Sequence, residues 1–393
     1  MSAALALPAI YLDYAATTPV DPAVRDAMLP FLGEEGFGNP SSVHRVGQYV
    51  RRAIDGARDT IAAEIGADSS EVYFTSGGTE ADNTAVLGVL LAARAETGRD
   101  HLVTTVTEHH AVLDCARWAE TILGFRVTYL PVDGEGFVDP NRVADAVTEQ
   151  TALVSVMHAN NEIGTIQPIR EIAHRAHQCG AYLHTDAVQT LGQMPLNVNS
   201  LQVDLMTLSA HKIYGPKGSG ALYVRRGVRW TPWLHGGQQE REKRAGTENA
   251  AGIVGFGKAV ELLPTWRDSE AVRLTLLRDS FISDVLSALP GARLNGPTGT
   301  ARLPNNGNLS FPGDDGATLL LSLDMHGVAA SSGSACASGS IDPSHVLLAL
   351  GLPDAIVRSA VRFSLGRGTT ADQLSRVIQI LRKIVHPVGR VGV

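Results

Sequence analysis

Lys212 occupies a position where a lysine is difficult to bury as a cation. It follows the apolar segment 203–208, which we expect to be a buried strand, and it precedes a glycine-rich turn at 214–218. A lysine at the carboxyl end of a buried strand has to be ion-paired, lowered in pKa or used covalently. An isolated lysine on such a turn is more commonly an exposed surface residue. The neighbouring strand ends therefore decide which interpretation holds.

Two other expected strand ends carry groups that complement a reactive amine. Asp186 follows the strand expected at 181–185, and Gln189 comes three residues later. Segment 75–80 combines a strand end, two glycines and a helix start, where free backbone amides can hold a phosphate. Ligands of open α/β sheets bind outside the carboxyl ends of the strands. A Schiff-base lysine, a carboxylate for a pyridinium nitrogen and a phosphate cradle together predict a pyridoxal-phosphate (PLP) enzyme.

Other ligand motifs are disfavoured. The glycine-rich segment 215–220 lacks the Gly-Lys-Ser/Thr ending of a P-loop and leads into a strand rather than a helix. No Gly-x-Gly-x-x-Gly opens the first βα unit, which disfavours a dinucleotide fold. His174, His177 and Cys179 lie on one expected helix, but only the two histidines share a face, which argues against zinc.

Composition excludes several classes of protein. The 33 basic and 40 acidic residues give a net charge of −7, which excludes a strongly basic nucleic-acid binder. The run 240–244 contains charges of both signs, and we expect it to be a solvated or interfacial loop. The hydrophobic content of 44% is typical of a globular protein. No apolar run reaches the roughly 18 residues that a membrane helix needs, and segment 1–9 lacks the basic start of a secretory signal. Three scattered cysteines form no disulfide framework, which favours the cytoplasm.

The order of the expected elements predicts an α/β protein with a second, smaller domain. Between residues 71 and 224 strands alternate with helices, which indicates a largely parallel, buried sheet. From about residue 249 a long helical stretch leads into short strands and two further helices, a pattern typical of an α+β domain. We expect an N-terminal segment that packs on the small domain, a large PLP-binding domain and a small C-terminal domain, with bounds at 1–20, 21–260 and 261–393.

The same segments resemble a known family. The motif Ser-Ala-His-Lys-Ile-Tyr-Gly-Pro-Lys-Gly at 209–218 is similar to the lysine motif of cysteine desulfurases of the NifS/IscS type, which are class V aminotransferases of PLP fold type I. Further matches follow the family's order along residues 10–370, at 11–19, 38–44, 107–112, 158–164, 244–249, 331–336 and 362–367. The resemblance implies a mostly parallel seven-stranded sheet in the large domain and a catalytic cysteine loop on the small one.

The resemblance also implies roles around the cofactor. Lys212 would form the Schiff base with PLP and move the substrate α-proton, while Asp186 would keep the pyridine nitrogen protonated. Gln189 would hydrogen-bond the ring O3′, and His109 would stack on the ring as a catalytic residue. Four residues of the same chain would hold the phosphate, namely Gly78, Thr79, Ser209 and His211.

Three further residues complete the implied site. Thr247 would reach the phosphate from a neighbouring subunit, which implies a homodimer with composite sites. Asn161, near the cofactor, and Arg362 would bind the substrate carboxylate, a task that suits a planar guanidinium. Ordinary structural roles compete with these: a turn for Asn161, a salt bridge for Arg362 and a helix cap for Thr247. In the same way His109 could only cap its helix, and Gln189 could be a helix-surface amide.

Cys336 lies in segment 331–340, a run of small residues with little to bury, and we expect a mobile surface loop there. The resemblance implies that its thiolate attacks the sulfur of PLP-bound cysteine and becomes a persulfide. An ordinary thiol has a pKa of about 8.5, so the site has to favour the thiolate or supply a proton acceptor. Cys336 is also a possible iron–sulfur contact, with no metal required, whereas Cys115 and Cys179 have helical spacing and are expected to pack.

The function predicted is that of an L-cysteine desulfurase, which converts cysteine to alanine and passes sulfur to an iron–sulfur scaffold or another acceptor protein. A selenocysteine lyase or β-lyase on the same fold is the enzymatic alternative, and an aminotransferase is less favoured because it has no use for Cys336. A sulfur-delivery scaffold that mainly docks an assembly partner is an alternative of another class. The chain ends at Val393, soon after its last expected helix, which leaves the partner open.

Overall fold

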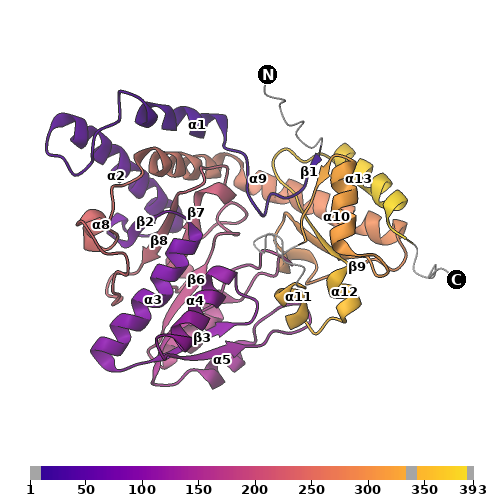
Figure 1. The fold of residues 1–393 in the computed structure, drawn as a ribbon, viewed down its shortest axis with the longest axis horizontal. Helices are drawn as coiled ribbons and strands as arrows, with labels where there is room; N and C mark the ends of the chain where they lie inside the picture. The colour runs from indigo at the N-terminus through magenta and orange to yellow at the C-terminus, as the bar shows by residue number, and fades with distance from the viewer. Residues whose placement is uncertain (1–9, 333–342, 387–393) are drawn as a thin grey trace.

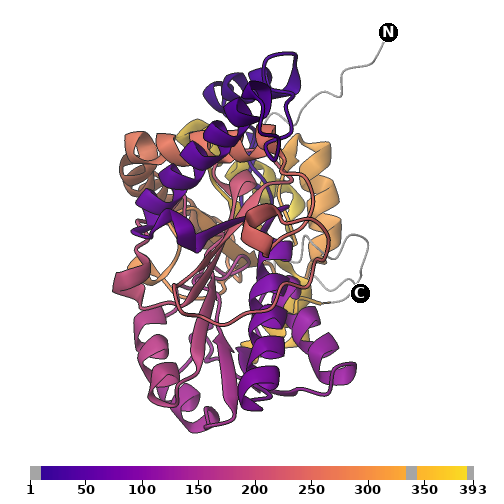
Figure 2. The same cartoon turned by 90° about the vertical axis from the view of Figure 1, so that its left-hand side faces the viewer.

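The computed structural model describes residues 10–332 and 343–386 and contains a large sheet covered by helices on both faces (Figures 1 and 2). The sheet has seven strands, in the spatial order β2 (Val72–Thr75), β8 (Gly220–Val224), β7 (Leu205–Ser209), β6 (Tyr182–Asp186), β5 (Thr151–Ser155), β3 (His101–Thr105) and β4 (Arg126–Leu130). Strands β7, β6, β5, β3 and β4 run parallel, and β8 is antiparallel to both of its neighbours. This architecture confirms the predicted fold class.

The two faces of the sheet build two separate hydrophobic cores. Because strand side chains alternate, Val154 enters one core while its neighbour Leu153 enters the other. Helices α2 (Arg45–Ile65), α6 (Ile169–Gln178) and the first part of α9 (Ala250–Ala288) contribute to the first core. Helices α3 (Gly78–Thr97) and α4 (His110–Thr121) contribute to the second.

A smaller unit follows the large sheet in the chain (orange and yellow in Figure 1). Its antiparallel sheet has the order β12 (Ala360–Ser364), β10 (Asn306–Ser310) and β9 (Arg293–Leu294), and helices α10 (Gly316–Met325) and α13 (Ala371–Ile384) pack on it in a third core. The short helices α11 (His345–Ala349) and α12 (Asp354–Arg358) lie beside it. The predicted bound at 260/261 falls inside α9, which supplies Phe256 to the first core and Phe281 to the third. One helix therefore serves both units, and the domain bounds stay a prediction.

The N-terminal segment connects the two units. Strand β1 (Ile10–Tyr11) pairs in parallel with β11 (Val328–Ala329) of the smaller unit, a two-residue ladder that the sequence pattern did not indicate. The chain then crosses to the large unit, where the Thr18 amide donates to the His211 carbonyl over 3.0 Å. Segment 10–18 is therefore held at both ends, by β11 of the smaller unit and by the turn after β7 of the large sheet.

The bounds of several helices have local causes. Helix α1 (Pro22–Met28) continues as a 3₁₀ turn over Leu29–Leu32, because Pro30 has no amide to donate. Helices α5 (Pro140–Ala146), α7 (Val198–Leu201) and α8 (Gln239–Glu242) are too short for a periodic signal. No helix within residues 10–332 and 343–386 is long and apolar enough to cross a membrane.

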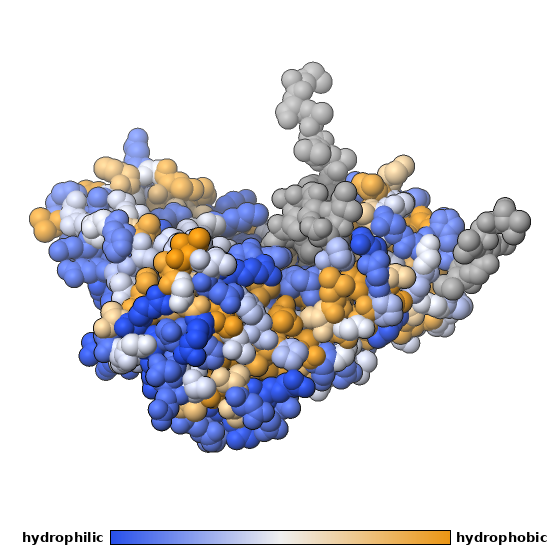
Figure 3. All heavy atoms as spheres, turned by 60° about the horizontal axis from the view of Figure 1, so that its bottom comes forward, coloured by the Kyte–Doolittle hydropathy of each residue, from blue (hydrophilic) through white to orange (hydrophobic). Residues whose placement is uncertain are grey.

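The mixed-charge run 240–244, expected to be a solvated or interfacial loop, is partly buried. Glu240 is buried and accepts two hydrogen bonds of 2.7 Å from the guanidinium of Arg58 and one of 2.8 Å from the Phe74 amide. Residues 240–242 all have positive φ angles, between 47° and 65°, which is strained for side-chain-bearing residues. The buried ion pair holds this turn in place. Elsewhere on the surface, as in Figure 3, hydrophilic and hydrophobic side chains are interspersed.

Candidate active site

A cavity of about 280 Å³ lies at the carboxyl ends of the large sheet's parallel strands, near the lower end of the roughly 300–1,000 Å³ typical of ligand pockets. Ten residues predicted for the site line it: Gly78, Thr79, His109, Asn161, Asp186, Gln189, Ser209, His211, Lys212 and Arg362. They come from strand ends, helix starts and β12, far apart in the sequence. The fold thus brings together the residues that the motifs singled out.

Lys212 is held inside the cavity by the N-terminal segment. It lies in a 3₁₀ turn directly after β7, and its Nζ donates to the carbonyl oxygens of Ala15, at 2.5 Å, and Ala16, at 2.7 Å. The Gln189 side-chain amide donates to the same Ala15 carbonyl over 3.0 Å. The amine is therefore anchored at the cavity wall, where an aldehyde in the cavity would meet it.

Asp186 is a buried acid at the end of β6. Its Oδ1 accepts a 2.8 Å hydrogen bond from the Val188 amide. Burial raises the pKa of Asp186 to about 6, although the Val188 hydrogen bond and the charge of Lys212 oppose that rise. A cationic N–H in the cavity would compensate this buried carboxylate, which fits the pyridinium nitrogen of PLP.

The start of α3 forms an anion cradle beside β7. Gly77, the N-cap residue, supplies no side-chain hydrogen bond, so the first amides of this 20-residue helix remain available. The buried hydroxyl of Ser209 has no hydrogen-bond partner among the described residues. A Cβ on Gly78 would lie 3.0 Å from Val188 Cγ2, so a larger residue here would require the Val188 side chain to shift. The orphan hydroxyl and the open helix start fit a phosphate.

His109 has the structural role that competed with its predicted one. It is the N-cap of α4, and its Nδ1 accepts a 3.1 Å hydrogen bond from the Ala111 amide. Burial, and then the charge of Lys212, lower the pKa of His109 to about 4. The ring is therefore neutral at pH 7 and lines the cavity, with its orientation fixed by the cap.

Arg362 on β12 is almost fully buried, and its guanidinium contacts both the large unit and the N-terminal segment. Its Nη1 donates over 2.9 Å to the backbone carbonyl of Asn161, and its Nη2 donates over 2.7 Å to Asp13 Oδ1 on the N-terminal segment. The salt bridge considered for Arg362 is thus present, with a partner 349 residues away in the chain. Asp13 was given no role in the sequence analysis, although it lies within the matched segment 11–19. Its position follows from the β1–β11 pairing.

Two predicted residues are not found among the described residues that line the cavity. Thr247 is exposed and lies outside the cavity of its own chain, and the N-cap of α9 is Asn249, whose side chain accepts from the Gly252 amide. Thr247 is therefore not the cap that was considered for it. Cys336 lies outside the described residues. On the opposite side of the protein, His177 Nε2 is 2.7 Å from Asp204 Oδ2.

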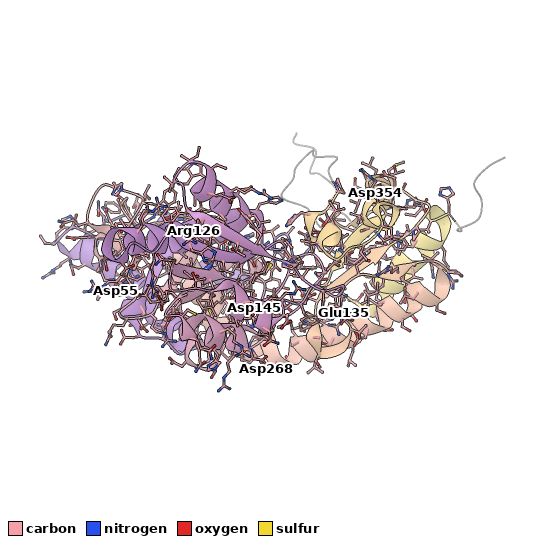
Figure 4. All side chains as sticks on the ribbon, turned by 90° about the horizontal axis from the view of Figure 1, so that it is seen from below. Asp55, Arg126, Glu135, Asp145, Asp268 and Asp354 are labelled. Carbon is pink, nitrogen blue, oxygen red and sulfur yellow. The ribbon has the colours of Figure 1, made fainter. Side chains whose placement is uncertain are left out.

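Sequence reasoning missed a set of buried acids in and beside the cavity wall. Most carboxylates of this protein resemble Asp268 and Asp354, which lie at the surface (Figure 4) with side-chain exposures of 79% and 65%. In contrast, Asp82, Glu108 and Glu162 are at most 2% exposed. Burial raises the pKa of Glu108 to about 8 and also raises that of Glu162. Glu108 and Glu162 lie in matched segments, but only the fold shows that they are buried.

Comparison with known proteins agrees with this site. Residues 10–377 match the family described as Aminotransferase class-V, and the chain belongs to this family. A relative from Dictyoglomus turgidum described as "Cysteine desulfurase IscS" is 52% identical over 98% of this chain and 96% of its own length. A solved "NifS-like protein" is 36% identical with a TM-score of 0.89, covering 95% of this chain and 98% of that one. A structure titled "SspA in complex with cysteine" is 35% identical, with a TM-score of 0.78 over 91% and 98% of the two chains.

Proposed function

We propose that this protein is a PLP-dependent cysteine desulfurase that forms L-alanine from L-cysteine and takes up the sulfur on Cys336. The observation that carries the proposal is the meeting of ten predicted residues in one cavity, with an amine, a buried acid and an anion cradle at strand ends. The relatives described as cysteine desulfurases, with about half of their residues identical over nearly the whole chain, support the same activity.

The residues that line the cavity support a proposed place for each part of the cofactor. Lys212 would hold PLP through its amine, Asp186 would pair with the ring nitrogen, and the start of α3 with Ser209 would bind the phosphate. When bound, PLP supplies a ring that withdraws electrons from the substrate α-carbon. The residues of the cavity fit PLP because the buried Ser209 hydroxyl has no other partner among the described residues and no side chain caps the start of α3.

The chain's own groups would orient the substrate and move protons. Arg362 would bind the substrate carboxylate with Asn161, and Lys212 would carry the α-proton. The proton of a thiol that enters the cavity has to pass to another group, because Nδ1 of the neutral His109 ring already accepts from the Ala111 amide. The Cys336 thiolate would then attack the substrate sulfur: a C–S bond breaks, an S–S bond forms, and cysteine plus the enzyme thiol becomes alanine plus a persulfide without an external oxidant.

The first test is the visible spectrum of the purified protein. A bound cofactor band that borohydride bleaches is expected in the wild type and is expected to be absent in Lys212→Ala. Lys217 is exposed and lies outside the cavity, so Lys217→Ala is the matched control and should keep the band. Full alanine production by a colourless protein would overturn the proposal.

The second test follows the sulfur. After incubation with cysteine, the peptide that contains Cys336 should gain the mass of one sulfur, and Cys336→Ser should lose both this gain and alanine formation. Cys115→Ser is the matched control, because Cys115 is buried in the second core. Full activity of Cys336→Ser, or a preference for selenocysteine, would favour the lyase alternative.

We also propose a cytoplasmic homodimer in which Thr247 completes the neighbouring site and an acceptor protein takes the sulfur. The exposure of Thr247, and of apolar residues such as Phe37 and Val43 near α2, supports a subunit contact. Co-expression of a Thr247→Ala chain with a Lys212→Ala chain tests it. Mixed dimers would contain one intact site of two, so up to about a quarter of the wild-type activity should return if the subunits pair at random. No recovery would refute the composite site.

Capture of an acceptor protein that also receives label from radioactive cysteine tests the proposed sulfur transfer.

A further inference from the structure

Two aspartates, Asp82 and Asp186, line the cavity, and only Asp186 has a role in the proposed function. Asp186 on β6 and Asp82 on α3 both line the cavity, and both are buried. Asp82 is only 1% exposed, and its Oδ1 has no hydrogen-bond partner among the described residues. Two carboxylates that line the same buried cavity cannot both ionise without a large electrostatic cost.

The surroundings favour the negative charge on Asp186. The Val188 amide donates to Asp186, and the charge of Lys212 acts on it. Asp82 has neither of these. The side chain nearest to it that is able to become a cation is His184, whose Nε2 is 3.7 Å from Asp82 Oδ1, but burial lowers the pKa of His184 to about 3 and keeps the ring neutral.

The other polar groups beside Asp82 supply no positive charge. The Thr207 hydroxyl lies 3.0 Å from His184 Nε2, and His184 Nδ1 is in turn 2.8 Å from the Ser155 hydroxyl. Thr207 is also the cross-strand partner of Asp186 in the sheet register, and it opposes the rise in the pKa of Asp82 without outweighing burial. These neutral groups do not compensate a negative charge on Asp82.

We propose that Asp82 is a positioning residue that stays a neutral carboxylic acid and thereby leaves the single negative charge of the buried pair on Asp186. The pKa of Asp82 agrees in direction, since burial and then the charge of Asp186 raise it well above its ordinary value. Other titratable groups that interact with Asp82 are Glu108, itself raised to a pKa of about 8, and the Cys115 thiol of α4. The consequence for the cofactor rests on the proposed function, whereas the protonation of Asp82 does not.

The decisive test uses the cofactor-free protein at pH 7, so that its result is independent of PLP. Infrared difference spectra of Asp82→Asn against the wild type should show the loss of one protonated-carboxyl C=O band. Asp186→Asn should keep that band. Glu108→Gln is the matched control, because Glu108 is also a buried neutral acid and should remove a different band. Loss of the Asp82 band in Asp186→Asn instead, or no loss in Asp82→Asn, would overturn the proposal.

A second measurement needs no variant that has to fold. Carbon-13 spectra of the wild-type protein with labelled aspartate should show one buried aspartate carboxyl that is protonated at pH 7, and the absence of any such carboxyl would overturn the proposal. In the loaded enzyme, Asp82→Asn mimics the neutral acid and should move the pH titration of the cofactor absorbance by less than about half a pH unit, equivalent to under 1 kcal/mol. Asp186→Asn should change it strongly. If the protein binds no PLP, only this last comparison fails, and the proposed function fails with it.

Discussion

Replacement of Arg362 by lysine gives a sharp test of how the substrate carboxylate is bound. The guanidinium is 1% exposed and uses two of its nitrogens on Asn161 and Asp13. The planar guanidinium of arginine can bind a carboxylate and still keep its contacts with Asn161 and Asp13. A lysine keeps the positive charge but has no planar fork with which to do both. Because a hydrogen bond to a charged group contributes about 1.5–3 kcal/mol, Arg362→Lys should lower kcat/KM for L-cysteine by roughly 10- to 150-fold.

The assay compares two substrates that differ only at the carboxylate. Product formation from L-cysteine should fall by this factor, and most of the loss should appear in KM. L-cysteine methyl ester has no carboxylate charge, so its slower reaction should change by no more than about threefold, or under 1 kcal/mol. Arg367→Lys is the matched control, because Arg367 forms a 2.8 Å ion pair with Asp21 outside the cavity lining and should leave both substrates unchanged. An equal loss for both substrates would refute a carboxylate-binding role.

Three further predictions concern stability and reactivity. The pKa of buried His158 is lowered to about 4, so the folded protein binds fewer protons there than the unfolded chain between pH 4 and the ordinary value of 6.5. This contribution of His158 to the free energy of unfolding is fully present above pH 6.5 and is lost as the pH falls toward 4, by at most about 3 kcal/mol. The stability of His158→Gln in urea should therefore depend less on pH in that window than the stability of the wild type. Glu240→Gln leaves Arg58 buried without its counter-ion and should cost about 3–5 kcal/mol in urea unfolding, whereas Asp26→Asn in an exposed pair should cost under about 1 kcal/mol. Burial raises the pKa of Cys115 to about 12, so iodoacetamide at pH 8 should leave this residue unmodified until the protein unfolds, as mass spectrometry of its peptide would show.

Much of the large unit could be predicted from the sequence because its signals are local. Apolar runs marked the parallel strands. Gly66, whose φ is 70°, ends α2 in the left-handed conformation that a glycine adopts without strain. The meeting of the residues that line the cavity could also be expected, since Lys212, Asp186 and the start of α3 each lie at or just after the end of a strand. The carboxyl ends of parallel strands meet at one edge of a sheet, so local order was enough to bring them together.

Contacts between distant segments could not be predicted in this way. The pairing of β1 with β11 involves two residues on each side, too few for a periodic pattern, yet it places Asp13 on Arg362 and two carbonyls on Lys212. The burial of Glu240 was missed for a related reason. A charged run looks solvated in a sequence, and only its packing against Arg58 reveals a buried pair.

The sequence by itself determined which chemical groups this protein has and the order of its strands and helices, because both depend on residue type and near neighbours. The tertiary structure alone decided the charge of those groups. Asp82, Asp186 and Glu108 are ordinary carboxyl groups in the chain, and their protonation depends on burial and on charges brought close by the fold. Electrostatic interactions act through space rather than along the chain, and for this reason the sequence could name the acids but not their charges.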